Sequence, residues 1–162
     1  MSYYFILIRA NKKLKYTQES KYSMKHVFVL RHAQKNMLTS GITKKGEEEC
    51  HQAQRVFPQF SLVICSEKKR CYETAMHLTN TEPQADSRAN IEHDSGKELV
   101  ALILETLKKV NDNENAVIIT HEPCLGPALS LLQHKIPPQE IIHFGPLQGF
   151  VVDEKKKVKI LH

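Results

Sequence analysis

Three short, continuously apolar runs constrain the fold of this chain more than any other feature. They are Val27–Leu30, Leu62–Cys65 and Ala116–Ile119. A strand that is apolar at every position has both faces covered, as in parallel sheets that carry helices on each side. The longer segments between these runs have room for crossover helices. The pattern therefore predicts an α/β fold, a three-layer sandwich in which a mainly parallel sheet has helices on both faces.

The segments between and after these runs predict four helices. They are Gly46–Phe57, Lys69–Thr79, a helix from Ser95 to about Val110, and Leu125–Gln133. Thr43 is expected to cap the first helix, and Pro58 to end it. Ser95 and Glu98 have the spacing of a capping box at the start of the third helix.

Three weaker strands complete the expected sheet. A short strand is expected near Ala89–Ile91. Phe150–Val152 and Val158–Leu161 flank the polar segment Asp153–Lys157, which is typical of a hairpin. A terminal hairpin would give the sheet an antiparallel edge.

Charge divides the chain of 162 residues into two parts. Residues 1–23 hold Arg9, Lys12, Lys13, Lys15 and Lys21 against Glu19 alone, so most of the net charge of +5 lies there. We expect a basic N-terminal appendage over 1–23 and one domain over 24–162, with Met24 as an alternative start. Because the domain itself is close to neutral, a nucleic-acid partner is not expected.

Cysteine and histidine spacing gives no sign of a metal or cofactor. The four cysteines include no C-x-x-C pair, and the nine histidines include no H-E-x-x-H. Free thiols fit a reducing cytoplasm, where we expect the protein. The apolar run Tyr3–Ile8 is too short for a signal peptide core, and no run is long enough to span a membrane. We therefore expect neither export nor a membrane partner.

Cationic side chains follow each of the three strong strands. Arg31 and His32 follow the first, Arg70 lies one helical turn past the second, and His121 follows the third. Ligands of such sheets bind at the carboxyl ends of the strands, so these groups are expected to converge. A cluster of potential cations repels itself unless an anion binds at its centre, and guanidinium groups match phosphate oxygens in pairs. The pattern predicts a phosphate-binding pocket.

Four ordered motifs resemble the histidine phosphatase superfamily, also called the phosphoglycerate-mutase-like family. They are Arg31-His32-Ala33-Gln34, Ile42-Thr43-Lys44-Lys45-Gly46, the set Ser66, Arg70, Thr74 and Ala75, and His121-Glu122-Pro123. The resemblance covers the chain from about residue 25 to the C-terminus and implies a catalytic domain.

The resemblance implies a covalent mechanism. His32 would attack phosphorus and become a phosphohistidine, which water would then hydrolyse. Arg31, Arg70 and His121 would bind the phosphoryl oxygens, and Glu122 is expected in the same phosphate-binding set. A phosphate ester also needs a general acid.

Two carboxylates are candidates for that general acid. Glu92 fits a Glu-x-x-x-Gly spacing of the family, and Asp94 is its rival. A phosphoramidate leaves more readily and can dispense with an enzyme acid.

The length of the chain favours one branch of the family. The span between Arg70 and His121 has room for one loop and one helix, so no cap is inserted there. An open site suits a phosphate displayed on a protein, and the chain is most similar to the small SixA-type phosphohistidine phosphatases. A phosphomonoesterase acting on a small phosphate ester and a non-catalytic, phosphate-dependent binding module are the alternatives. Cys65, which precedes Arg70 with Cys-x4-Arg spacing, is a rival nucleophile.

Overall fold

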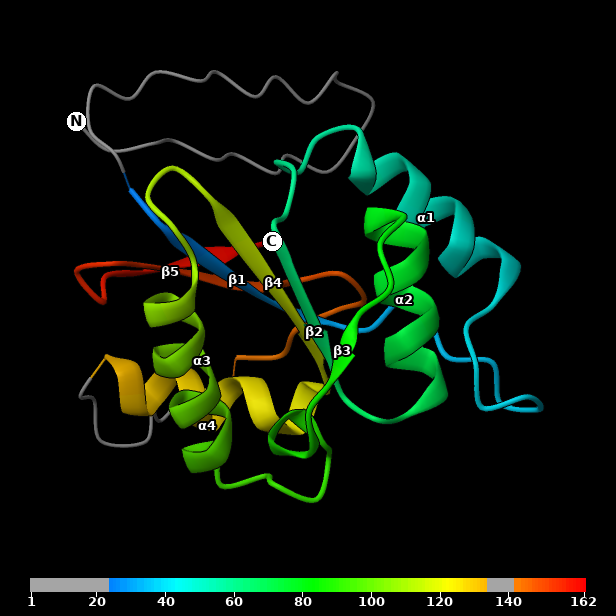
Figure 1. Ribbon diagram of the computed structural model, residues 1–162. Helices are drawn as coiled ribbons and strands as arrows, with labels where there is room; N and C mark the ends of the chain where they lie inside the picture. The colour runs from blue at the N-terminus through cyan, green and yellow to red at the C-terminus, as the bar shows by residue number, and fades with distance from the viewer. Residues whose placement is uncertain (1–23, 134–141) are drawn as a thin grey trace.

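The computed structural model describes residues 24–133 and 142–162. These form one six-stranded sheet with the order β3-β2-β4-β1-β5-β6 (Figure 1). Strands β1, β2, β3 and β4 run parallel, and β5 pairs antiparallel with both β1 and β6. The bounds are His26–Arg31 for β1, Leu62–Cys65 for β2, Gln84–Ala85 for β3, Asn115–Thr120 for β4, Gly149–Asp153 for β5 and Val158–Leu161 for β6.

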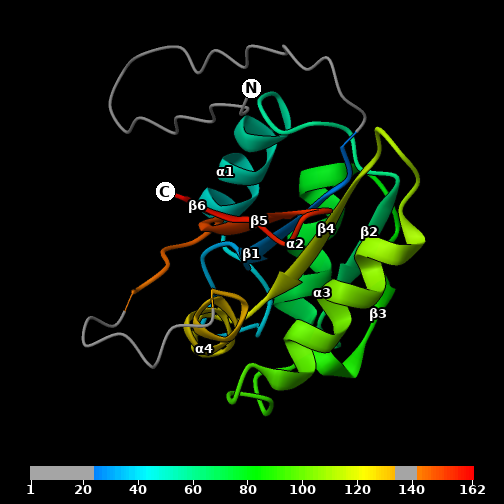
Figure 2. The same cartoon turned by 90° about the vertical axis from the view of Figure 1, so that its left-hand side faces the viewer.

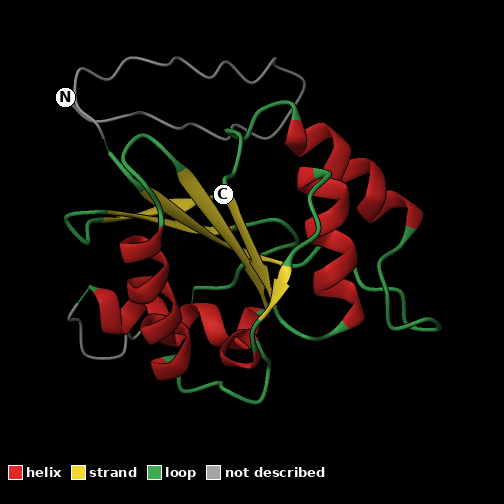
Figure 3. Ribbon diagram, in the orientation of Figure 1, coloured by secondary structure: helices red, strands yellow, loops and turns green. Residues whose placement is uncertain are grey.

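Two pairs of helices cover the two faces of this sheet (Figures 2 and 3). One face carries α1 (Lys44–Gln54) and α2 (Lys69–Thr79). The other carries α3 (Lys97–Lys109) and α4 (Glu122–Leu132), together with a 3₁₀ turn at Ser87–Ala89. The predicted three-layer α/β sandwich with an antiparallel edge is confirmed.

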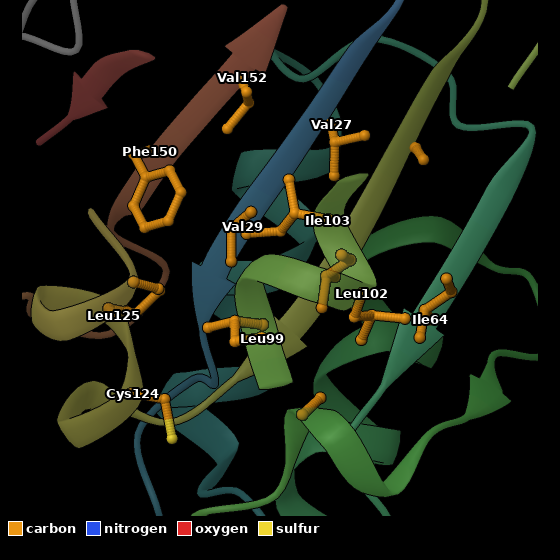
Figure 4. Packing of buried hydrophobic residues seen from close by; sticks show 14 of the residues in the cluster. Val27, Val29, Ile64, Leu99, Leu102, Ile103, Cys124, Leu125, Phe150 and Val152 are labelled. Carbon is orange, nitrogen blue, oxygen red and sulfur yellow. The ribbon is translucent and has the colours of Figure 1, made fainter. Parts of the chain in front are cut away.

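Strand β1 divides its side chains between two separate apolar clusters. Val27 and Val29 pack with α3 and α4, where Leu99, Leu102 and Ile103 approach the sheet (Figure 4). Phe28 and Leu30 pack on the opposite face with α1 and α2. Because side chains alternate along a strand, only a continuously apolar sequence can supply both clusters.

Two helix starts were predicted from capping residues, with different outcomes. The Thr43 hydroxyl accepts a hydrogen bond from Gly46 N at 3.0 Å, as expected for the cap of α1. At α3 no capping box forms, because the helix begins after Gly96, at Lys97. The Ser95 hydroxyl instead accepts from Lys97 N and donates to the Glu98 carboxylate.

Gly96 explains why α3 begins where it does. Its φ of +75° is in the left-handed region that favours glycine. A Cβ at this position would overlap the backbone of Ala128 in α4. The two helices on this face therefore approach one another at a residue without a side chain.

The prediction of a strand at Ala89–Ile91 is wrong. The chain pairs earlier, in the two-residue strand β3, and then turns through the 3₁₀ helix. Asp86 fixes this turn, because its carboxylate accepts a hydrogen bond from Arg88 N at 2.9 Å and also binds the Arg88 guanidinium. Local side-chain bonding of this kind competes with strand pairing.

The ends of two helices differ from the predicted ones, and one predicted segment lies outside the part of the chain that the structure describes. Helix α1 ends at Gln54, three residues before the predicted Phe57, and α4 begins at Glu122, three residues before the predicted Leu125. The basic appendage over 1–23 lies outside the described residues. Within the described ranges, no helix is long and apolar enough to cross a bilayer.

Candidate active site

The carboxyl ends of β1, β2 and β4 lie side by side, as the sequence predicted. Arg31 at the end of β1 is in register with Thr120 at the end of β4, and Cys65 at the end of β2 is in register with Ile119. The backbone N–H of His32 donates to Thr120 O at 3.0 Å. The residues that follow the three strands are thereby brought to a single edge of the sheet.

The hydrogen bonds of His32 fix its tautomer. Nδ1 lies 2.7 Å from the carbonyl oxygen of Ala33. A carbonyl oxygen only accepts, so Nδ1 carries the proton. Nε2 therefore holds a lone pair, and Arg70 Nε donates to it at 3.1 Å. The side chain presents an unprotonated nitrogen to the cationic site.

Burial keeps this imidazole neutral. The pKa of His32 is lowered to about 4, mainly because burial desolvates the ring, and the nearby charges of Arg70, Arg31 and Lys35 contribute to the same lowering. A neutral imidazole nitrogen is a competent nucleophile near neutral pH. The environment of His32 is therefore suited to attack on an electrophilic phosphorus.

His121 has the opposite tautomer and begins a chain of hydrogen bonds. Arg70 Nη2 lies 3.1 Å from Nδ1, and since a guanidinium only donates, Nδ1 is the acceptor. Nε2–H then donates to the Ser66 hydroxyl at 2.9 Å, and that hydroxyl donates to Asn90 Oδ1 at 2.7 Å. Asn90 Nδ2 in turn donates to Glu67 at 2.7 Å. Every member of the chain has a partner that fixes its orientation.

Burial and the charge of Arg70 lower the pKa of His121 to about 3. Its ring lies 5.3 Å, centroid to centroid, from the ring of His32. Arg70 therefore bridges two neutral histidines, and its guanidinium is the cationic group that binds both of them.

Arg31 has a buried donor without a partner. Its Nη1 donates to the carbonyl oxygen of Phe144 at 2.6 Å. Its Nε is buried and has no hydrogen-bond partner among the residues that the structure describes. An unpaired buried donor is costly, on the order of 1–3 kcal/mol, and an anion bound beside Arg31 would satisfy it.

Thr74 ties the nucleophile loop to α2. Its buried hydroxyl accepts a hydrogen bond from Ala33 N at 3.0 Å and donates to Arg70 O at 2.6 Å. The backbone that follows His32 is thus held to the helix that carries Arg70, so the relative positions of the two catalytic candidates are fixed.

Comparison with known proteins identifies the fold. No family model and no curated protein matches the sequence. Among solved structures, the protein histidine phosphatase SixA complexed with tungstate superposes with a TM-score of 0.63 at 16% identity, covering 85% of this chain and 94% of that one.

Two further structures are similar over a comparable length. A phosphoserine phosphatase mutant from Entamoeba histolytica has a TM-score of 0.66 at 13% identity, covering 84% of this chain and 94% of its own. A phosphoglycerate mutase from Plasmodium falciparum has a TM-score of 0.59 at 17% identity, covering 86% and 90%. The chain has the histidine phosphatase fold.

In this histidine phosphatase fold, the predicted carboxylates lie at the periphery of the site. Glu122, at the first position of α4, binds the exposed His143 at 3.0 Å with its carboxylate. Glu92 is exposed and forms an ion pair with Lys68 at 2.5 Å. That bond lowers the pKa of Glu92, so its carboxyl group is ionised at neutral pH. Asp94 is exposed.

The cysteine alternative is not supported by the environment of Cys65. The side chain is fully buried, and burial raises the pKa of its thiol to about 11. A nucleophilic cysteine needs a lowered pKa, because the thiolate is the reactive form. In the described ranges, no group of three or more His, Cys, Asp or Glu side chains is placed to hold a metal ion.

Two parts of the site were not predicted from the sequence. The carbonyl of Phe144 binds Arg31 from 113 residues away along the chain, and a backbone group leaves no sequence signal. Asn90 binds Ser66 from the segment where a strand was expected. The sequence carried no signal for this role, because the burial of Asn90 is seen only in the structure.

Proposed function

We propose that this chain is a phosphatase that acts through a phosphohistidine intermediate on His32. The observation that carries the proposal is the unprotonated Nε2 of His32, which is held 3.1 Å from a guanidinium nitrogen of Arg70. A nucleophile beside fixed cationic donors is the arrangement that phosphoryl transfer requires. The histidine phosphatase fold supports the same chemistry.

The first step forms a bond from Nε2 to phosphorus and breaks the bond from phosphorus to the leaving group. The lone pair of Nε2 attacks, and the leaving nitrogen or oxygen departs with the bonding electrons and takes up a proton from the solvent. Arg70 exchanges its hydrogen bond to Nε2 for one to a phosphoryl oxygen, and the unpaired Nε of Arg31 donates to another. These donors stabilise the charge of the transition state.

The second step returns the enzyme to its starting state. Water attacks phosphorus and loses a proton to the solvent, the P–N bond breaks, and its electron pair returns to Nε2. A bound phosphate dianion favours the charged form of a neighbouring imidazole, so His121 would take up a proton at Nδ1 and donate it to a phosphoryl oxygen. The Ser66 hydroxyl, which accepts from Nε2 and is itself bonded to Asn90, holds the ring in place for this change.

A phosphohistidine in a protein is the proposed substrate. Its leaving imidazole does not demand a strong acid from the enzyme, and Glu92 is held in its ionised form by Lys68. The second candidate is a small phosphate ester, because Glu92 is close enough for the His121 ring to influence its pKa. In that case Glu92 or Asp94 would supply the proton. The proposal includes a cytoplasmic location, supported by four buried free cysteines.

Trapping of ³²P on the protein tests the covalent step. We expect acid-labile, alkali-stable label on the wild type, no label on His32→Ala, and normal labelling of His51→Ala, whose side chain is exposed on α1. Label that persists in His32→Ala would contradict the proposal. Phosphate binding without label or turnover would favour the binding-module alternative.

Comparison of three substrates then tests the substrate class. A phosphohistidine peptide is expected to be hydrolysed faster than 3-phosphoglycerate or an aryl phosphate. Faster hydrolysis of 3-phosphoglycerate would assign the chain to the small-ester class instead.

A further inference from the structure

A short hairpin between β1 and α1 carries two large apolar side chains into solvent. Met37 is 80% exposed and Leu38 is 95% exposed. The loop that holds them projects from the body of the molecule (Figure 1). Exposed apolar side chains that gather at one place mark interaction sites in soluble proteins. The construction and the position of this hairpin indicate what it binds.

The tip of the hairpin has a defined conformation. Lys35 and Ile42 form an antiparallel bridge, and Asn36 N donates to Gly41 O at 2.8 Å. The Asn36 side chain accepts from Leu38 N at 2.9 Å and from the next backbone N–H at 3.3 Å. Asparagine bonding of this kind fixes a turn. Met37 and Leu38 are therefore held outward by the backbone that carries them.

The hairpin is also braced against the helix that carries Arg70. Ile42 N donates to the Glu73 carboxylate at 2.7 Å, and Glu73 lies about one turn after Arg70 on α2. A Cβ on Gly41 would overlap that carboxylate, so the absence of a side chain allows the close approach. The orientation of the tip is thus fixed relative to the active site.

The hairpin borders the active site on a positively charged side. Its first bridged residue, Lys35, is three residues after His32 and lies close enough for its charge to act on that imidazole. Lys35 forms no ion pair within the described ranges, which leaves its charge available to a partner. The surface next to the nucleophile therefore combines an apolar tip with an unpaired cation.

We propose that Met37 and Leu38 are the docking point for the phosphorylated protein substrate. While its phosphohistidine occupies the site, an apolar side chain of the substrate packs on the tip and acidic groups face Lys35. An apolar contact surrounded by complementary charge is the usual composition of a protein interface. This inference rests on the proposed function and adds the sequence character of the substrate. A small ester that fills the site does not reach the tip.

Turnover of three substrates by hairpin variants tests the proposal. Leu38 lies six residues from His32, so peptides of about 12 residues centred on phosphohistidine can span both. One peptide has leucine and glutamate residues around the phosphohistidine, the second has glycine and serine, and the third substrate is phosphoramidate. The variants are Leu38→Ser, the double variant Met37→Ser/Leu38→Ser, and the control Leu131→Ser, which changes a leucine that is 42% exposed on α4.

We expect the double variant to lower kcat/KM about tenfold for the leucine–glutamate peptide, the size of a small hot spot. Hydrolysis of phosphoramidate and of the glycine–serine peptide should change less than about twofold, and Leu131→Ser should behave as the wild type. An equal loss on all three substrates would show that the hairpin supports the site itself. No loss on any of them would also overturn the proposal.

A binding measurement separates this proposal from the proposed function. In a His32→Ala background, we expect the double variant to weaken binding of the leucine–glutamate phosphopeptide about tenfold by fluorescence anisotropy. If the intact protein hydrolyses none of the substrates but binding still depends on the tip, the proposed function fails and the docking surface stands. If hydrolysis occurs but binding is independent of the tip, the docking surface fails.

Discussion

The two site histidines are neutral for the same physical reason, and each is locked in a different tautomer. Burial is the largest cause that lowers the pKa of both His32 and His121. In His32, Nδ1–H donates a hydrogen bond to Ala33 O, whereas in His121, Nε2–H donates to the Ser66 hydroxyl. Arg70 therefore faces a lone pair on each ring, which leaves its positive charge uncompensated until an anion binds.

The titration of His32 tests this assignment directly. Protonation of Nε2 removes the nucleophile, and with a pKa of about 4 that loss occurs well below pH 6.5. We expect two-dimensional ¹H–¹⁵N NMR of the free protein to show Nδ1 protonated and Nε2 unprotonated from pH 7 to pH 5. The same residue should titrate near 6.5 in urea, which serves as the control. A midpoint near 6.5 in the folded protein, or an Nε2–H signal at neutral pH, would contradict the tautomer.

Glu92→Gln distinguishes an ester substrate from a phosphoramidate. The ion pair with Lys68 and the lowered pKa keep Glu92 deprotonated, so it is poorly suited to donate a proton. We expect this variant to hydrolyse a phosphohistidine peptide within about threefold of the wild type, since a loss due to general acid catalysis is 10²-fold or more. Asp94→Asn is the matched variant. A hundredfold loss on an alkyl phosphate, restricted to Glu92→Gln, would instead establish Glu92 as the acid.

At the residue scale, the sequence was informative where position along a strand determines position in space. His32 and His121 were found because each directly follows a buried strand, and Arg70 because it lies one helical turn further on. The placement of Glu92 and Glu122 was less predictable. A surface carboxylate can pair with any cation that the fold brings near it. The sequence does not show that Lys68 lies beside Glu92 or that His143 lies beside Glu122.

A buried hydroxyl on α2 braces the backbone that follows β1. Thr74 is fully buried and accepts the hydrogen bond of Ala33 N. Thr74→Val keeps the shape but leaves that N–H without a partner, which should lower the free energy of unfolding by about 1–3 kcal/mol. Because the same N–H follows the nucleophile, we also expect kcat/KM to fall about tenfold or more.

Thr106→Val provides the matched control for this variant. Thr106 is equally buried, but its hydroxyl only donates to Leu102 O within α3, so its loss leaves no N–H without a partner. We expect a change below about 1 kcal/mol and unaltered turnover. Equal effects of the two substitutions, measured by urea unfolding and by steady-state kinetics, would argue against the bracing role of Thr74.

The packing of α3 against α4 depends on the missing side chain of Gly96. Gly96→Ala adds a Cβ to a residue at φ +75° and drives it into the backbone of Ala128. Asn80→Ala is the matched control, because Asn80 is exposed and ends α2 at φ +53°. In Asn80→Ala, backbone strain alone should reduce the free energy of unfolding by about 1 kcal/mol. In Gly96→Ala, the overlap with α4 adds to the strain, so the loss should exceed about 2 kcal/mol. Equal losses would show that the helices separate without cost.

At the element scale, continuous apolar runs predicted the buried strands well, whereas local polar bonding limited the rest. Strand β2 has the bounds that were expected, because its sequence fits no exposed environment. Strand β3 was missed since it has two exposed residues and lies at the edge of the sheet. The start of α3 was misplaced because the position of Gly96 is decided by its approach to α4, a contact between distant segments.

The arrangement of the whole sheet places the residues that follow β1, β2 and β4 at one edge of the molecule. The sequence predicted the layers and the antiparallel edge but not the strand order, in which β4 lies between β2 and β1. That order matters for the site, because it places His121 between the residues that follow the other two strands. Long-range pairing of this kind is decided by the packing of the entire sheet.

Acid sensitivity is the consequence of this arrangement for the stability of the whole protein. His32 and His121 have pKa values lowered to about 4 and about 3 by burial, and burial also lowers that of His26. Unfolded histidines titrate near 6.5, so the unfolded state binds more protons between pH 6.5 and pH 4, and stability is lost as the pH falls through this window. Between pH 7 and pH 5, each of the two site histidines should contribute a loss on the order of 2 kcal/mol.

Urea unfolding at pH 7 and pH 5, in buffers free of phosphate, measures this loss. His121→Asn removes one of the two site titrations, so its stability should fall about 2 kcal/mol less than that of the wild type between the two pH values, whatever its stability at pH 7. Added phosphate should oppose the loss at pH 5, because an anion at Arg31 and Arg70 stabilises the folded state in proportion to its occupancy. If His121→Asn and the wild type lose equal stability, His121 is not held neutral by the fold.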